Sequence, residues 1–218
     1  MNEAGLPEEL ELETFGLDTV RIERYIEATF PDAWKQSVHM VPVSWIRTLS
    51  FKNSDIYSDL SDGTGYVVLP DDFYLLVAFR MDGWRKSVYK TFESDDKTAL
   101  LQSNEYTRGS EIRPVCLIRM RNINENNKDV VSPDMRNVLE YYSLRRGLLR
   151  HSIKEAYYIP VCRPLSEYEQ DEELELDSRL TDVMAYLSAS TVFMIFEKGD
   201  IVQNLQRKAA DMVPCLKD

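Results

Sequence analysis

Apolar residues recur every three or four positions near both ends of the chain, a spacing typical of amphipathic helices. The first such stretch runs from about Leu17 to Met40. Asp18 is placed to cap its start, since a side-chain oxygen there can accept a free backbone N–H. Pro31 is expected to divide it into two helices, because proline is tolerated in a first turn but not in a helix interior.

The C-terminal part of the sequence predicts two further helices. One covers Ser178–Glu197, where the apolar positions share one broad face. Gly199 is expected to stop this helix and Asp200 to cap the next, which ends before Pro214. Two antiparallel helices joined in this way would form a helical hairpin.

From Pro42 to about Cys162 the pattern changes to short apolar or alternating stretches separated by turn residues. Asp82-Gly83 favours a tight hairpin turn, because glycine supplies the positive φ that such turns require. A short helix is expected over Asp95–Asn104. The stretches rich in Val, Ile, Tyr and Phe, and therefore predicted as strands, are Tyr66–Leu69, Tyr74–Arg80, Arg85–Phe92, Val115–Arg121, Val138–Tyr142 and Ala156–Val161.

These elements predict an α+β fold in which the terminal helices form a helical bundle and an antiparallel β-sandwich or barrel module is inserted between them. The expected organisation is an acidic N-terminal arm (1–16), a helical bundle (17–41 and 173–213), a β-rich module (42–165) and a C-terminal tail (214–218).

Charge is distributed unevenly along the chain. The 218 residues include 37 acidic and 26 basic side chains, for a net charge of −11. Six of the acids lie in residues 1–18 and seven in residues 166–177, and neither segment contains a base. The remainder is close to neutral. Such runs do not favour tight binding of phosphates, which depends on Lys and Arg. They are either solvated surface or surfaces that repel DNA or dock a basic partner.

The sequence gives little indication of a membrane helix, a secretory signal or a disulfide framework. No run approaches the roughly 18 apolar residues of a membrane helix, and the acidic N-terminus lacks the pattern of a secretory signal. The widely spaced Cys116, Cys162 and Cys215 indicate buried free thiols instead of a disulfide framework or zinc site.

Candidate catalytic groups are few. His39 and His151 are the histidines of the chain, and no metalloprotease, nucleophile-elbow or phosphate-loop motif occurs. The pairs Asp71-Asp72 and Asp95-Asp96 could suggest acid–base chemistry. Adjacent residues of an extended chain point to opposite faces, however, so we expect a turn or capping role for Asp71 and no catalysis by either pair.

One basic cluster is the best candidate for a contact with a partner or polyanion. It consists of Arg145, Arg146 and Arg150, with His151 beside them, and it lies between two predicted strands. A solvated loop is the alternative. In the second acidic run, the candidates for a contact with a basic partner are Glu169, Asp171, Glu172 and Glu173.

The middle of the sequence contains the series Gly65-Tyr-Val-Val-Leu-Pro-Asp-Asp-Phe73, followed by an apolar stretch and by Gly83-Trp84-Arg-Lys-Ser-Val88. This series resembles head-to-tail connector (adaptor) proteins of tailed bacteriophages. Gln102–Gly109 followed by Arg113-Pro114-Val115 is similar to ring proteins of crAss-like phages of Bacteroidota. Tyr141-Tyr142-Ser143, Tyr158-Ile159-Pro160 and the last two helices continue the pattern, so that the resemblance covers roughly residues 17–212.

This resemblance implies a structural virion protein, made in the host cytoplasm and located in the neck or tail region. It implies a homo-oligomeric ring, expected to have twelve copies, below the portal protein and in contact with neighbouring tail or ring proteins. Genomic DNA would pass through its channel with no sequence-specific contact. In such a ring, we hypothesise that the basic cluster Arg145, Arg146 and Arg150 receives the acidic run of an adjacent subunit. No enzymatic activity, cofactor, metal or membrane contact is implied. The alternatives are a tail-terminator or tail-hub ring subunit, an intracellular binding module, and an enzyme with an unrecognised site.

Overall fold

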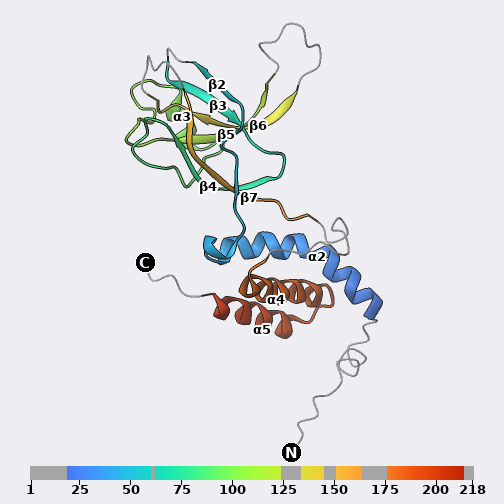
Figure 1. Ribbon diagram of the computed structural model, residues 1–218. Coiled ribbons are helices and arrows are strands. Elements are labelled where there is room, and N and C mark those ends of the chain that lie inside the picture. Colours follow the sequence, from blue (N-terminus) through green and yellow to red (C-terminus); the bar gives the residue numbers. More distant parts are fainter. Residues whose placement is uncertain (1–18, 60–61, 124–133, 145–150, 164–175, 214–218) are drawn as a thin grey trace, which may run out of the picture. The chain divides into compact units, whose positions relative to one another are not determined.

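The chain has a mixed α+β fold, which a computed structural model describes for residues 19–59, 62–123, 134–144, 151–163 and 176–213 (Figure 1). Side chains are described from residue 24 onward. The chain divides into two compact units: Met1–Arg47 with Cys162–Asp218, and Thr48–Val161. None of the helices in the described ranges is long and apolar enough to cross a membrane.

The first unit contains three described α-helices, α2 (Thr19–Met40), α4 (Ser178–Ile195) and α5 (Gly199–Met212). A short 3-10 helix, η1 (Val43–Trp45), follows α2. Both α2 and α5 pack against α4. The first part of the apolar face predicted for α4 is buried, namely Leu180, Val183, Met184 and Leu187. Met194 and Ile195, at the end of that predicted face, are 56% and 53% exposed. A buried hydrogen bond joins the hydroxyls of Thr29 and Ser188, 2.7 Å apart, between α2 and α4.

Two helix boundaries differ from the prediction. Pro31 does not end a helix but lies inside α2, which is bent (Figure 1). A bend is the expected result, since proline lacks the N–H of one helical hydrogen bond and its ring crowds the preceding turn. Gly199 is not the stop after α4. Glu197 takes the left-handed conformation, with φ 57°, and Gly199 begins α5. Asp200 therefore lies in the first turn of α5 and not at its cap.

The second unit contains two antiparallel sheets. In the first, the strand order is β1 (Leu49–Ser50), β7 (Ile153–Pro160), β4 (Phe73–Met81). In the second, it is β2 (Ile56–Asp59), β3 (Thr64–Val68), β6 (Met135–Tyr141), β5 (Cys116–Asn122). The predicted strands at 66–69, 74–80, 115–121, 138–142 and 156–161 correspond to β3, β4, β5, β6 and β7, whereas β1 and β2 were not predicted.

Side chains from both sheets form one hydrophobic cluster. Phe79 from β4, Leu139 from β6 and Ala156 from β7 are almost completely buried in it. Phe51, between β1 and β2, stacks on Phe79 with ring centres 5.8 Å apart. Burial of apolar side chains such as these is the main favourable term in folding, at about 25 cal/mol for each Å² removed from water.

The segment after β4 was predicted as a strand over Arg85–Phe92, and this prediction was wrong. The hairpin turn itself is present, because Gly83 has φ 89° and the Trp84 N–H donates to the carbonyl of Met81. After the turn, only two isolated bridges form: Val88 pairs with Phe79 of β4, and Phe92 pairs with Leu117 of β5. The segment thus crosses from an edge of one sheet to an edge of the other.

The helix expected over Asp95–Asn104 is present as α3 (Lys97–Gln102). It begins after Asp96, whose carboxylate accepts the Thr98 N–H at 2.7 Å. This backbone hydrogen bond, together with one from the Thr98 side chain, lowers the pKa of Asp96. This carboxylate therefore serves a helix cap and not acid–base chemistry.

Gly65 is the position where the sheet of β2, β3, β6 and β5 admits no side chain. A Cβ atom on Gly65 would lie 2.5 Å from the Tyr141 hydroxyl and 2.5 Å from the carbonyl oxygen of Tyr57. Gly65 and Tyr141 are paired across β3 and β6, and the Tyr141 side chain is fully buried. The close approach of this ring therefore requires glycine.

We predict that Gly65→Ala lowers the free energy of unfolding by about 1–3 kcal/mol, the usual cost of overpacking a closed site. Urea denaturation of both proteins measures this difference. Gly199→Ala is the matched control, because a Cβ there meets nothing within 4 Å and should change stability by less than about 0.5 kcal/mol. Equal stability of wild type and Gly65→Ala would contradict the role assigned to the Tyr141 ring.

Candidate functional site

The residues predicted from sequence as contacts lie outside the described part of the chain. These are the basic cluster Arg145, Arg146 and Arg150 and the acidic candidates Glu169, Asp171, Glu172 and Glu173. Their pairing between subunits stays a prediction. The acidic arm 1–16 and the tail 214–218 lie outside the described residues as well.

His151 was expected to share a basic surface with the arginines before it, and this was wrong. Only 9% of its surface is exposed. Its Nδ1 lies 3.0 Å from the hydroxyl of buried Tyr141. Burial raises the pKa of the Tyr141 hydroxyl, which therefore stays protonated at neutral pH. The Nε2 atom is buried and makes no hydrogen bond within the described ranges. This histidine belongs to the interior, while His39 is exposed on α2.

The carboxylate pair after Pro70 separates as its spacing predicts. Asp71 and Asp72 lie in the turn before β4. Asp71 makes a 2.6 Å ion pair with Arg136, whereas Asp72 accepts a 2.8 Å hydrogen bond from the Tyr158 hydroxyl. The two carboxylates therefore have different partners and do not converge on one substrate.

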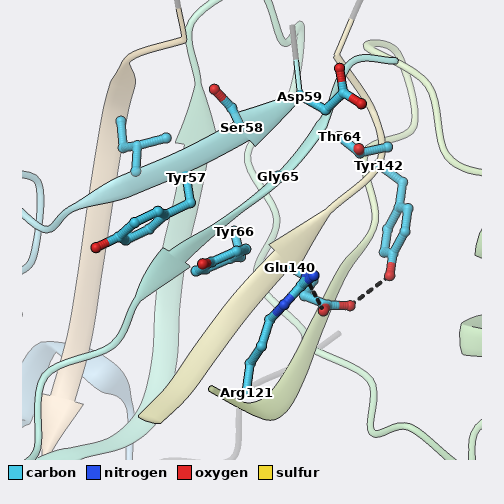
Figure 2. Close-up of a pocket in the computed structure, with 10 residues that line it drawn as sticks. Tyr57, Ser58, Asp59, Thr64, Gly65, Tyr66, Arg121, Glu140 and Tyr142 are labelled. Carbon is cyan, nitrogen blue, oxygen red and sulfur yellow. Dashed lines mark hydrogen bonds and ion pairs between the residues drawn. The ribbon is translucent and has the colours of Figure 1, made fainter. Parts of the chain in front are cut away.

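Sequence reasoning did not find a hollow on the outer face of the sheet formed by β2, β3, β6 and β5 (Figure 2). Its volume is about 520 Å³. We call it the outer-face hollow. Strand alternation places its main side chains on the side of the sheet opposite Tyr141. The residues that line it are Ile56, Tyr57, Ser58, Asp59, Thr64, Gly65, Tyr66, Arg121, Glu140 and Tyr142.

Glu140 is the electrostatic centre of this face, and 6% of its surface is exposed. One carboxylate oxygen lies 3.2 Å from Arg121, and the other lies 3.2 Å from Arg119. The Tyr142 hydroxyl donates to the second oxygen at 2.6 Å. A buried carboxylate is stable only when it is paired and hydrogen-bonded in this way.

Two tyrosine rings extend these contacts across the sheet from Arg121. The Arg121 guanidinium lies over the Tyr66 ring, 4.8 Å from its centre. Tyr66 stacks in turn on Tyr57, with ring centres 4.9 Å apart and planes 11° from parallel. Burial and the hydrogen bond to Glu140 raise the pKa of Tyr142 to about 12. Its hydroxyl therefore stays protonated at neutral pH and remains a donor.

The lining of the hollow combines aromatic, hydroxyl and charged groups. It presents phenol rings, a threonine hydroxyl, carboxylates and one guanidinium. Across the described residues, no group of three or more His, Cys, Asp or Glu side chains could hold a metal ion. The sequence signal for the hollow is the alternation in Val138-Leu139-Glu140-Tyr141-Tyr142, which places a charged residue and a tyrosine on the face opposite Leu139 and Tyr141.

Glu140→Gln should lower the free energy of unfolding by about 1–3 kcal/mol, because the two arginines lose their shared counter-charge. The cost stays below that of a fully buried pair, since Arg119 and Arg121 are 36% and 44% exposed and can turn toward water. Chemical denaturation of this variant is compared with Glu93→Gln, which removes an exposed carboxylate. If both variants were as stable as wild type, Glu140 would not hold this face together.

Stability should also fall as the pH drops from about 7.5 to about 5, partly because of His151. Burial lowers the pKa of this imidazole, and nearby Asp59 opposes the shift. The unfolded chain, with a histidine pKa of about 6.5, therefore binds the proton first and is favoured as the pH falls below that value. Denaturation midpoints across this range should depend less on pH in His151→Gln than in the control His39→Gln. Identical pH dependence in both variants would contradict the assignment.

Comparison with known proteins gives no further constraint on this face. No protein-family model matches the sequence, and no curated protein matches it.

Proposed function

We propose that this chain is a structural subunit of the ring that joins the head of a tailed phage to its tail, below the portal protein. The proposal begins from the sequence pattern of residues 65–88, which resembles connector proteins. In this proposal the terminal helices form a bundle, and the β unit between them is a sandwich or barrel. Copies of the chain surround the DNA channel and contact the portal and neighbouring tail or ring proteins.

The observation that carries the proposal is the exposure of large apolar side chains on the β unit. Leu100 in α3 is 69% exposed and Leu101 is 49% exposed, while Tyr106, shortly after α3, is 93% exposed. Several exposed apolar residues within so short a segment are typical of a surface that a partner covers. A ring subunit has such partners on both sides, because each copy presents one face to one neighbour and a different face to the other.

A second exposed surface lies on the hairpin of β5 and β6. β3 pairs with β6 only over Val138–Tyr141, whereas β5 pairs with it from Met135 onward. The outer part of the hairpin is therefore two-stranded. Met120 and Met135 on it are 67% and 51% exposed. Two-stranded ribbons are marginally stable alone, and methionine adapts well to a partner surface. Both features suit a hairpin that becomes buried on assembly.

The first experiment determines the oligomeric state of the purified protein, by native mass spectrometry and negative-stain imaging. The proposal expects rings with a central hole and twelve copies. Six copies would favour the tail-terminator or tail-hub alternative. A monomer that neither forms rings nor binds the portal protein of the same phage would overturn the proposal, so portal binding is measured in the same series.

Charge reversal tests the predicted contact between subunits. Arg145→Glu with Arg146→Glu should reduce ring assembly, because these residues are expected to receive the acidic run around Glu169–Glu173 of a neighbour. Arg85→Glu with Lys86→Glu is the matched control, since it reverses an adjacent, exposed basic pair. If the first variant assembled as well as wild type, this contact would be refuted. The proposal that the chain forms a ring would not be affected by that result.

A further inference from the structure

Strand β2 forms one edge of the sheet whose order is β2, β3, β6, β5. Alternate residues of β2 direct their backbone groups toward β3. The carbonyl of Asp55 accepts the Val68 N–H at 3.2 Å, and the carbonyl oxygen of Tyr57 also lies against β3. In an antiparallel pair, the residues between these have their N–H and C=O groups on the other side. The backbone groups of Ile56 and Ser58 therefore point away from β3.

These outward backbone groups are available to another chain. Across the described residues, no strand other than β3 pairs with β2, and no backbone hydrogen bond engages Ile56 or Ser58 on the outward side. Asp55, Tyr57 and Ser58 are exposed along the same edge. An edge with free N–H and C=O groups can pair with an extended segment of another protein, which is a common mode of peptide recognition.

The ring of Tyr57 adds a requirement for the side chains of such a segment. It stacks on Tyr66 of β3 with ring centres 4.9 Å apart, and Figure 2 shows the two rings side by side. Since β2 is the edge strand, the opposite face of the Tyr57 ring is turned away from the sheet, and 39% of the residue is exposed. An aromatic side chain on an added strand can stack on this face, a favourable kind of cross-strand pair.

The carboxylate of Asp55 adds a second requirement. Residues two positions apart share one face of a strand, so Asp55 and Tyr57 lie on the same face of β2. In an antiparallel partner, the residue opposite Asp55 comes two positions after the residue opposite Tyr57. Asp55 is exposed and forms no ion pair with another described residue. A lysine or arginine at that position of the partner complements its charge.

A second copy of β2 is not complementary in this way. When two β2 strands pair symmetrically about Tyr57, Asp55 of each copy lies opposite Asp59 of the other. Like charges directly opposite each other are destabilising. The charge on β2 therefore favours a basic segment of a different protein.

We propose that the free edge of β2 binds an extended segment of another protein in which an aromatic residue is followed two positions later by lysine or arginine. The segment adds to the sheet as an antiparallel strand, and its backbone exchanges hydrogen bonds with Ile56 and Ser58. Its aromatic ring stacks on Tyr57, and its cationic side chain lies opposite Asp55. This inference does not depend on the proposed ring.

Saturation-transfer NMR with the full-length protein and the peptide acetyl-Thr-Thr-Tyr-Thr-Lys-Thr-amide tests the site. The method detects weak binding to a protein of any size. We expect a dissociation constant on the order of 1 mM for so short a strand, with the strongest transfer to the tyrosine ring of the peptide. The same peptide with glutamate in place of lysine should bind about 3- to 10-fold more weakly.

Proline at position 58 tests the backbone contact. Ser58→Pro removes the outward N–H, and proline is tolerated in an edge strand where that group faces solvent. This variant should bind the lysine peptide about 10-fold more weakly or worse, because a hydrogen bond is lost and the proline ring obstructs the edge. Ser58→Ala is the matched control and should bind within about 2-fold of wild type. Both variants lose the Ser58 side-chain hydrogen bond to Tyr141, whereas Ser58→Pro alone loses the N–H.

Exchange of charge tests the contact with Asp55 and leaves the backbone unaltered. In Asp55→Lys the preference should reverse, so that the glutamate peptide binds more tightly than the lysine peptide. Asp82→Lys is the control, because Asp82 is an exposed turn residue outside β2. It should keep the preference of wild type.

Three results would each overturn the proposal. They are the absence of saturation transfer from wild type to the lysine peptide, equal binding by wild type and Ser58→Pro, and an unchanged peptide preference in Asp55→Lys. Circular dichroism establishes that Ser58→Pro is folded, and the Asp55→Lys comparison decides the question if proline disturbs the fold. Self-association of wild type that Ser58→Pro abolishes, measured by sedimentation without peptide, would identify a second copy as the occupant and would also overturn the proposal.

Discussion

The β unit depends on the fully buried ring of Tyr141, which lies across Gly65 where β3 pairs with β6. Tyr141 faces the core cluster on one side of the sheet and holds His151 through a hydrogen bond. Because no side chain fits at Gly65, the register of β3 against β6 has little freedom at this point. A slip of one residue would move every side chain of the strand to the other face. The hollow on the outer face therefore depends on a contact made on the inner face.

On the outer face of the sheet, Glu140 restricts the positions of the side chains around it. Glu140 neighbours Tyr141 in β6 and points the opposite way, so the same strand supplies a core aromatic and a buried carboxylate. Arg121 and Tyr142 are held in place by that carboxylate. Side chains fixed by such contacts lose little freedom when a ligand arrives, and this reduces the entropic cost of binding. The geometry suits recognition in this sense.

The sequence predicted the strands whose apolar residues form compact runs. β4 and β7 were found because Phe73–Met81 and Ile153–Pro160 are rich in Val, Ile, Tyr and Phe. β2 was missed because Ile56 and Tyr57 stand among polar residues and the strand has four positions. The stretch after Gly83 has strand composition, yet only Val88 and Phe92 form β-bridges there. Composition indicates a tendency to pair, but the available neighbours decide where pairing occurs.

Other features could not be predicted because they depend on tertiary contacts. The hollow gathers Asp59, Thr64, Arg121 and Tyr142 from separate parts of the chain, and no local pattern reveals which strands are neighbours. The end of α4 illustrates a different limit. Gly199 is the residue that intrinsic preference selects for a left-handed turn, yet Glu197 adopts it, at a cost on the order of 1 kcal/mol. The two helices joined by this turn, α4 and α5, pack against each other.

The segment from Val88 to Phe92 also affects how exposed the edges of the two sheets are. β4 and β5 are edge strands, and free edges tend to recruit strands from other molecules in uncontrolled aggregation. The backbone of Val88 forms hydrogen bonds with that of Phe79 in β4. The backbone of Phe92 forms hydrogen bonds with those of Cys116 and Ile118 in β5. Each edge is thus partly covered by the chain's own backbone. Fewer free backbone groups at these two edges are then left to pair with a strand of another molecule.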